Sequence, residues 1–249
     1  MIKTFKSKRA DYLIDKLLGN QGILDLNPVI AGGSALVVYR LLRMYDSDSK
    51  WLELKRKIDT GSIKNIIIDK YGDIDIWLLS DNPVHNKEHE LHWLVDDVED
   101  DAASTNKLNP SAYDDSNVCR KNNKLGLVLK STSKWANSYN FSSNKGGLIQ
   151  SGSIPIQFVK TTPKSSGSLL ESFDFINCSV AWHDGAMYYD SRLDAAFESF
   201  ELRLNSDIAY LKKSMPSKIF NTLRAFKYAQ RYNLDFSPKL AAQDRKSVV

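Results

Sequence analysis

The feature that most constrains the fold is a short apolar segment that runs through three small residues into a helical pattern. Pro28-Val-Ile-Ala31 has the composition of a buried strand, and Gly32-Gly33-Ser34 follows it directly. Residues 35–43 then space their apolar members as a helix does, and the helix is predicted to begin at or beside Ser34. Glycines at such a junction let the backbone approach a ligand, and the helix N-terminus favours a phosphate. Alone, this pattern is more typical of an ordinary turn.

A second segment, Asp73–Leu79, alternates in the way a strand does. Residues two apart in a strand share a face, so Asp73, Asp75 and Trp77 are predicted to lie on one side. Carboxylates spaced in this way, with Cβ atoms ~7 Å apart, can reach one hard cation, and Mg²⁺ binds carboxylate and phosphate oxygens. The alternative is an edge strand whose acids face water. Because acids are depleted in strands, two of them in an apolar strand favour metal binding.

Read together, Gly32-Gly33-Ser34 and Asp73-Ile-Asp75 resemble the DNA polymerase β-type nucleotidyltransferase superfamily. This superfamily includes CCA-adding enzymes, poly(A) polymerases, and antibiotic and protein nucleotidyltransferases. The more specific likeness is to uncharacterised nucleotidyltransferase-like proteins of phages and large viruses. The matching segments are Ile30–Leu36, Tyr71–Leu79, Ile156–Val159 with Phe173–Phe175, and Arg224–Tyr232.

The resemblance implies an α/β (α+β) fold, in which a mixed nucleotidyltransferase sheet is flanked by helices and followed by a C-terminal helical extension. We expect a catalytic domain over residues 1–205, with a loop-rich insertion at 104–146, and a helical segment over 206–249. The implied reaction moves a nucleoside monophosphate from an NTP to an acceptor hydroxyl of RNA, tRNA or protein and releases pyrophosphate. Mg²⁺ or Mn²⁺ is the implied cofactor.

The same resemblance implies roles for individual residues. Gly32-Gly33-Ser34 is expected to contact the nucleotide phosphates, and Asp73 and Asp75 are expected to bind the metal. A third acid is usual on a later strand, but the polar residue of Ile154–Val159 is Gln157, whose amide is a poor metal ligand and no base. Asp174 is the next carboxylate on a strand-like segment, Phe173–Trp182, and becomes the candidate for the third catalytic and metal-binding acid. A turn or capping role is its alternative.

The clearest predicted helix covers residues 217–232. One stripe of this helix is apolar and is expected to face the core: Ile219, Leu223 and Phe226. Another stripe is basic, with spacing i, i+3 and i+7: Arg224, Lys227 and Arg231. A basic stripe is most often solvated surface. The resembled proteins carry a similar segment after the catalytic domain, which favours contact with nucleotide phosphates or an RNA acceptor.

Other candidate sites have simpler explanations. Three histidines share a face of a predicted helix over residues 83–103 and would suit Zn²⁺, but their polar surroundings favour a solvated face: His85, His89 and His92. The acidic run at residues 96–101 is read as a solvated helix end, with Ca²⁺ as a remote alternative. Cys178 lies among apolar residues and is expected in the core.

Composition limits the class of protein. The 34 Lys and Arg against 30 Asp and Glu leave a net charge of +4, too small to argue for nucleic acid by itself. No apolar stretch reaches the ~20 residues of a membrane span, and the basic N-terminus lacks the apolar core of a signal peptide. Two cysteines cannot form a disulfide framework. We therefore expect a cytoplasmic protein (host cytoplasm, if viral) with no membrane partner.

Three functions remain open from the sequence. The leading hypothesis is the nucleotidyltransferase reaction described above. The second, motivated by Gln157, is a catalytically degenerate nucleotidyltransferase fold that binds nucleotide, nucleic acid or protein without turnover. The third is a toxin-like enzyme that modifies tRNA or protein of a host.

Overall fold

The structure, a computed structural model, describes residues 1–18, 21–60, 73–82, 127–132, 136–141, 156–205 and 215–245. Its helices are α1 (Lys8–Leu18), α2 (Gln21–Leu24), α3 (Gly33–Met44), α4 (Asp48–Asp59), α7 (Ser166–Glu171), α8 (Leu193–Glu198), α10 (Met215–Tyr232), α11 (Pro238–Arg245) and the 3₁₀ helix η5 (Ile176–Cys178). The predicted helix at 83–103, with its histidines and acidic run, and the Ile219 side chain lie outside the described residues.

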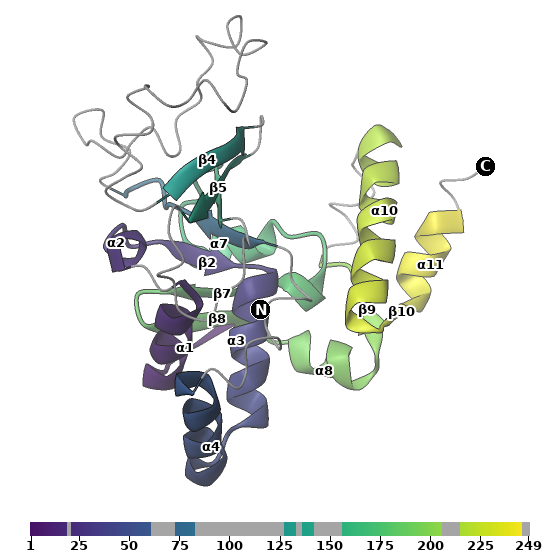
Figure 1. The fold of residues 1–249 in the computed structure, drawn as a ribbon. Coiled ribbons are helices and arrows are strands. Elements are labelled where there is room, and N and C mark those ends of the chain that lie inside the picture. Colours follow the sequence, from purple (N-terminus) through teal and green to yellow (C-terminus); the bar gives the residue numbers. More distant parts are fainter. Residues whose placement is uncertain are drawn as a thin grey trace, which may run out of the picture.

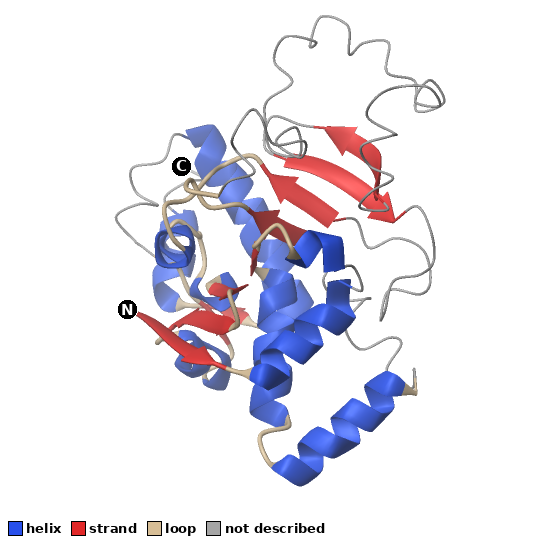
Figure 2. Cartoon of the chain, turned by 90° about the vertical axis from the view of Figure 1, so that its left-hand side faces the viewer, coloured by secondary structure: helices blue, strands red, loops and turns tan. Residues whose placement is uncertain are grey.

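Eight described strands form one mixed sheet in the order β1-β8-β7-β2-β3-β6-β5-β4 (Figures 1 and 2). Their bounds are β1 Ile2–Lys6, β2 Val29–Ala31, β3 Ile74–Trp77, β4 Leu127–Thr132, β5 Ala136–Phe141, β6 Ile156–Val159, β7 Val180–His183 and β8 Ala186–Asp190. The pairing of β3 with β6 is parallel, and the other pairings in this sheet are antiparallel. The predicted α/β fold with a mixed sheet is confirmed.

The two faces of the sheet are covered unequally. On one face, Ile30, Ile74 and Ile76 are buried in a large core together with apolar residues of α1 and α3. On the other face, Val29, Ala31 and Trp77 pack with Leu169 and Leu170 of the short helix α7. Asp75 shares this second face, because strand side chains alternate and both neighbours of Asp75 in β3 belong to the large core.

Helix bounds agree well with the sequence periodicity, whereas several strands were not predicted. The helices predicted over residues 35–43 and 217–232 lie within α3 and α10. The segment Phe173–Trp182, predicted as strand-like, contains a bend, η5 and only then β7. Buried Asn177 explains this: its amide donates to the Glu201 carbonyl at 3.1 Å and its side-chain oxygen accepts from the Arg203 N–H at 3.0 Å.

The C-terminal helices stand side by side at the edge of the sheet core (Figure 1). A separate parallel pair of strands, β9 (Glu201–Leu202) and β10 (Asp235–Phe236), lies at the base of α10. Four buried apolar residues of this region belong to the large core: Ala225, Tyr232, Leu234 and Leu240. The division at residue 205 stays a prediction, and the described part of the 206–249 segment shares the core of the sheet.

The apolar stripe predicted on α10 is wrong. Leu223 and Phe226 are 63% and 55% exposed. The core-facing side of α10 instead carries Ala225 and the two tyrosines Tyr228 and Tyr232, whose rings contact aromatic residues of the core. Within the described ranges, no helix combines the length and apolar character that a membrane crossing requires.

Candidate active site

The turn from β2 into α3 depends on Gly32. Its φ of 72° lies in the left-handed region, which side chains other than glycine rarely adopt. Its N–H donates to the Val180 carbonyl at 2.9 Å, and its carbonyl accepts from the Leu36 N–H at 2.9 Å, the first turn of the helix. The N-cap of α3 is therefore Gly32, and no side chain caps it. Ser34, predicted at or beside the cap, is buried in the first turn, and its hydroxyl lies 3.5 Å from the Ala31 carbonyl.

The glycine turn lies against the aspartate strand. Ala31 is the register partner of Asp75 across the β2–β3 pair, so the turn after Ala31 adjoins the beginning of β3. A Cβ atom placed on Gly32 would lie 3.8 Å from the Asp75 Oδ2 atom. The N-terminal N–H groups of a helix lack helical partners and carry partial positive charge. The structure thus brings together the two sequence motifs that lie about forty residues apart in the chain.

Both aspartates have raised pKa values. Burial and, to a smaller extent, the negative charge of Asp73 together raise the pKa of Asp75 to about 7. Burial also raises the pKa of Asp73. Desolvated acids that repel each other gain from a nearby positive charge, whether a divalent cation or a protonated side chain. This pair therefore favours cation binding.

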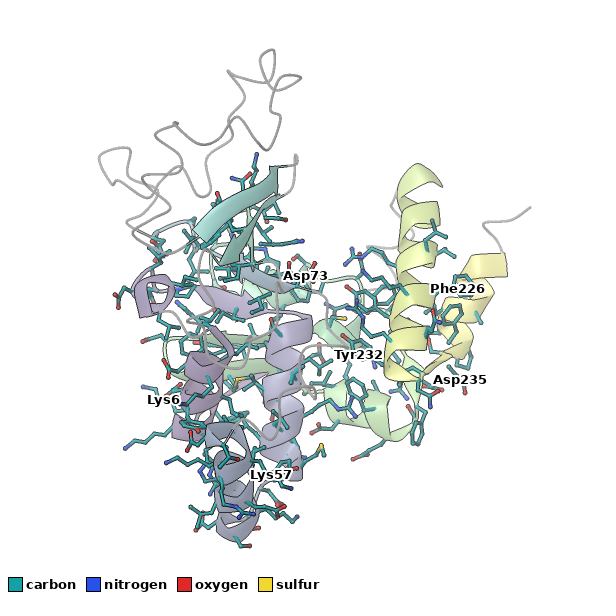
Figure 3. All side chains as sticks on the ribbon, viewed as in Figure 1. Lys6, Lys57, Asp73, Phe226, Tyr232 and Asp235 are labelled. Atoms are coloured by element: carbon teal, nitrogen blue, oxygen red, sulfur yellow. The ribbon has the colours of Figure 1, made fainter. Side chains whose placement is uncertain are left out.

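The basic stripe of α10 faces these aspartates. The positive charges of Lys227 and Arg231 oppose the rise in the pKa of Asp73, and those two charges together with Arg224 oppose it at Asp75. Figure 3 shows Asp73 on the side of the sheet toward α10 and Tyr232 projecting from α10 toward the sheet. The positive charges of the predicted stripe thus act on the carboxylates, while the Lys227 side chain is itself exposed.

Arg224 is held in a network of its own. Its Nη1 donates to the Asp174 Oδ2 atom at 2.9 Å, and its Nη2 donates to the Tyr228 hydroxyl at 3.3 Å. The guanidinium also lies over the Tyr228 ring, 5.7 Å from the ring centre. Tyr228 in turn stacks on Tyr232, with ring centres 5.9 Å apart and an angle of 2° between the planes. Sequence reasoning missed these tyrosines, although Tyr228 lies one helical turn after Arg224.

The position of Asp174 differs from the predicted one. This residue lies in the bend before the Phe175–Leu204 bridge and not on a strand beside β3. Its side chain is 12% exposed and pairs with Arg224. Among the described residues, no group of three or more His, Cys, Asp or Glu side chains is arranged to hold a metal ion. The expected set of three metal-binding carboxylates is therefore not seen in this part of the chain.

Gln157 occupies the position beside Asp75. The two residues are register partners across the parallel β3–β6 pair, and Ser138 is the register partner of Gln157 on β5. Partners in register share a face of the sheet. The second face of the sheet, which carries Asp75, therefore has a row of polar side chains: a carboxylate, an amide and a hydroxyl. The donor set suits one Mg²⁺ ion, which commonly takes one or two carboxylates and completes its shell with water and substrate phosphates.

Cys178 is buried as predicted, and burial raises its pKa to about 12, so this thiol stays protonated. Two surface hollows lie elsewhere: one of about 630 Å³ beside Phe200 and Phe226, and one of about 440 Å³ beside His183 and Tyr188. Neither hollow is lined by Asp73 or Asp75.

No protein-family profile and no curated protein sequence matches the chain. Solved structures of CCA-adding enzymes are similar in fold. The apo form I of a CCA-adding enzyme is 14% identical with a TM-score of 0.49, over 98% of this chain and 46% of that one. The Thermotoga maritima CCA-adding enzyme with tRNA is 14% identical, with a TM-score of 0.47, over 98% of this chain and 45% of that one. A tRNA nucleotidyltransferase with primer tRNA and an ATP analogue is 12% identical, with a TM-score of 0.43, over 91% of this chain and 48% of that one. The chain spans less than half the length of each of these proteins.

Proposed function

We propose that this chain is a metal-dependent nucleotidyltransferase, which moves a nucleoside monophosphate from an NTP to an acceptor hydroxyl and releases pyrophosphate. The observation that supports it is one juxtaposition. Of two desolvated aspartates, Asp75 lies beside the uncapped N-terminus of α3, and positive charges of the α10 stripe act on both. A triphosphate bound at a divalent cation requires acidic ligands on one side and positive charge around the phosphates on the other. Both are present here.

Each group has a distinct role in this proposal. Asp73 and Asp75 hold Mg²⁺ or Mn²⁺, which neutralises phosphate charge when bound. The N–H groups that begin α3 and the three cations of α10 bind phosphate oxygens. The acceptor oxygen forms a bond to the α-phosphorus as the bond to pyrophosphate breaks. Since the Gln157 amide is no base, the acceptor proton leaves to a carboxylate or to water.

The test is transfer of label from each α-³²P NTP, with Mg²⁺ or Mn²⁺, to RNA, to tRNA, to added protein or to the chain itself. Transfer should require divalent metal and should disappear in Asp75→Asn, which removes ligand charge with little change in volume. Asp235→Asn, which removes an exposed carboxylate on β10, is the matched control and should retain transfer. If NTP binding measured by calorimetry needs neither the metal nor Asp75, the assignment is wrong.

A second candidate function is favoured by Gln157 and by the Asp174–Arg224 ion pair. Without a third carboxylate at the metal, the same site would bind a nucleotide or nucleic acid with no turnover. This binding module predicts metal-dependent NTP affinity that falls in Asp75→Asn, with no labelled acceptor under any condition. The labelling experiment therefore separates the two functions directly.

The acceptor is the open part of this proposal. RNA or tRNA is the first candidate, since the solved structures of similar fold include complexes with tRNA. A protein acceptor, including a host protein or host tRNA modified by a toxin-like enzyme, is the second. The likeness to phage and large-virus proteins stays a proposal that rests on the short sequence matches alone.

A further inference from the structure

We infer that Asp174 is a positioning residue, which fixes the Arg224 guanidinium toward the Asp73/Asp75 site so that it binds a substrate phosphate. This inference rests on the proposed function, because it takes the two aspartates as the place where metal and triphosphate meet. It assigns Asp174 a different role from that of a third metal ligand.

Three contacts fix the orientation of Arg224. The ion pair with Asp174 holds Nη1, the Tyr228 hydroxyl holds Nη2, and the ring of Tyr228 lies against the guanidinium plane. Arginine on a free helix surface samples many rotamers, so each of these contacts reduces the entropy that phosphate binding would cost. Tyr228 is itself fixed, by stacking on Tyr232 and by an edge contact with the Phe175 ring at 5.6 Å.

The fold brings Asp174 to this position from a distant part of the chain. Asp174 lies fifty residues before Arg224, in the bend that leads into the Phe175 bridge and η5. Its carbonyl accepts from the Asn205 N–H at 2.9 Å, which anchors the backbone as well. The Asp174 side chain is 12% exposed and that of Arg224 is 40% exposed, so the carboxylate end of the ion pair is the better shielded from solvent.

The chemistry favours positioning over metal binding. A guanidinium presents five N–H donors in a planar fork; in Arg224 one donor is directed to an Asp174 oxygen and another to the Tyr228 hydroxyl. The chain that follows Asp174 passes through η5 to Val180, whose carbonyl accepts from the Gly32 N–H beside Asp75. The positive charge of Arg224 acts on Asp75 from this side. By contrast, Asp174 takes part in no described cluster of three metal-ligating side chains.

A double-mutant cycle on the full chain tests the inference, with inorganic tripolyphosphate plus Mn²⁺ as the probe and calorimetry as the assay. Asp174→Asn and Arg224→Gln should each weaken tripolyphosphate binding, by about fivefold to twentyfold. The double variant should be no weaker than Arg224→Gln alone, because Asp174 acts through Arg224. Asp174→Glu, which keeps the charge, should recover part of the affinity.

The affinity for Mn²⁺ alone, measured by electron paramagnetic resonance, separates positioning from metal ligation. It should be unchanged in Asp174→Asn and reduced in Asp75→Asn. The matched control is Glu201→Gln on β9, which breaks the 2.7 Å ion pair between Glu201 and Arg203. This variant should leave tripolyphosphate affinity unchanged. Thermal melts check that each variant folds, and Asp174→Ala takes the place of Asp174→Asn in the cycle if Asp174→Asn does not fold.

The outcomes are distinguishable. Loss of Mn²⁺ affinity in the Asp174 variant, or additive effects in the cycle, overturns the inference and leaves the proposed function intact. If the wild-type chain binds no tripolyphosphate in the presence of Mn²⁺, the proposed function fails and the inference fails with it.

Discussion

Asp75→Asn should make the metal-free protein more stable at neutral and alkaline pH, even though it removes a residue proposed to be essential for transfer. In the folded chain the pKa of Asp75 is about 7, against an ordinary value of 3.8. Well below pH 3.8 the carboxyl is protonated in both folded and unfolded chains and contributes nothing. As the pH rises toward 7, the unfolded chain ionises while the folded chain holds its proton, so stability is lost.

The size of this loss follows from the two pKa values. A difference of about three between them corresponds to ~4 kcal/mol at pH 8, as an upper bound. Burying an asparagine amide costs roughly 1–3 kcal/mol, so we expect Asp75→Asn to be more stable than wild type by about 1–3 kcal/mol at pH 8. The difference between the two proteins should widen by ~3 kcal/mol from pH 4.5 to pH 8.

The assay is urea denaturation of both proteins in EDTA across this pH range. Carboxyls with lowered pKa values, such as Asp190 and Asp46, shift stability the other way, but both proteins share them, so the difference isolates Asp75. Adding 10 mM Mg²⁺ should stabilise wild type by ~1.4 kcal/mol if the dissociation constant is ~1 mM, and should not stabilise the variant. A difference that is flat with pH would refute the desolvation of Asp75. Equal stabilisation of both proteins by Mg²⁺ would refute the metal assignment.

Three further predictions concern the turn, the basic stripe and the exposed face of α10. Gly32→Ala should lower the unfolding free energy by about 1–2 kcal/mol, because alanine at a φ of 72° is strained, whereas Gly167→Ala inside α7 should be neutral or stabilising in the same denaturation assay. Replacing the three cations of α10 with glutamine should weaken binding of an RNA oligonucleotide and reduce the slope of its salt dependence by ~1 per lost phosphate contact. The control for that triple variant replaces three exposed lysines near the N-terminus: Lys3, Lys6 and Lys8. An unchanged slope in the α10 variant would show that these three cations contact no phosphate and are ordinary solvated surface. Leu223→Ser should change stability by less than ~0.5 kcal/mol, while Phe226→Ser should cost about 1 kcal/mol, because the Phe226 ring contacts Phe236 with centres 4.9 Å apart.

The elements with strong periodicity could be predicted from the sequence. The alternation of Asp73 to Trp77 gave the correct two faces of β3, since Ile74 and Ile76 lie in one core and Trp77 in the other. The turn at Gly32 between a strand and a helix also followed from the residue pattern. These signals are local, so they need no knowledge of the partner strand or helix.

Features that depend on distant partners could not be predicted. β1 has one half-buried residue and four exposed ones, and it forms because β8 offers a free edge. β5 is rich in Asn and Ser, yet Asn137 and Tyr139 are buried against β6. On α10, the leucine–phenylalanine stripe and the tyrosine stripe are both helical in spacing. Tyrosine is amphipathic, and only the packing against Phe175 and Phe197 decides which stripe faces inward.

The pairing of β1 with β8 has a consequence for the order in which the chain acquires its structure. Lys6 pairs with Ala186 and Ile2 with Asp190, so the first strand has no partner until 180 further residues have been made. At ribosomal rates of ~5–20 residues per second, that wait is roughly 10–40 s. During this interval the residues of β1 are exposed with unpaired backbone N–H and C=O groups. The residues of β2 and α3 can already associate with each other in the same period. The lysines at both ends of the segment Lys3–Lys6 are suited to keeping such a waiting strand from pairing with neighbouring nascent chains.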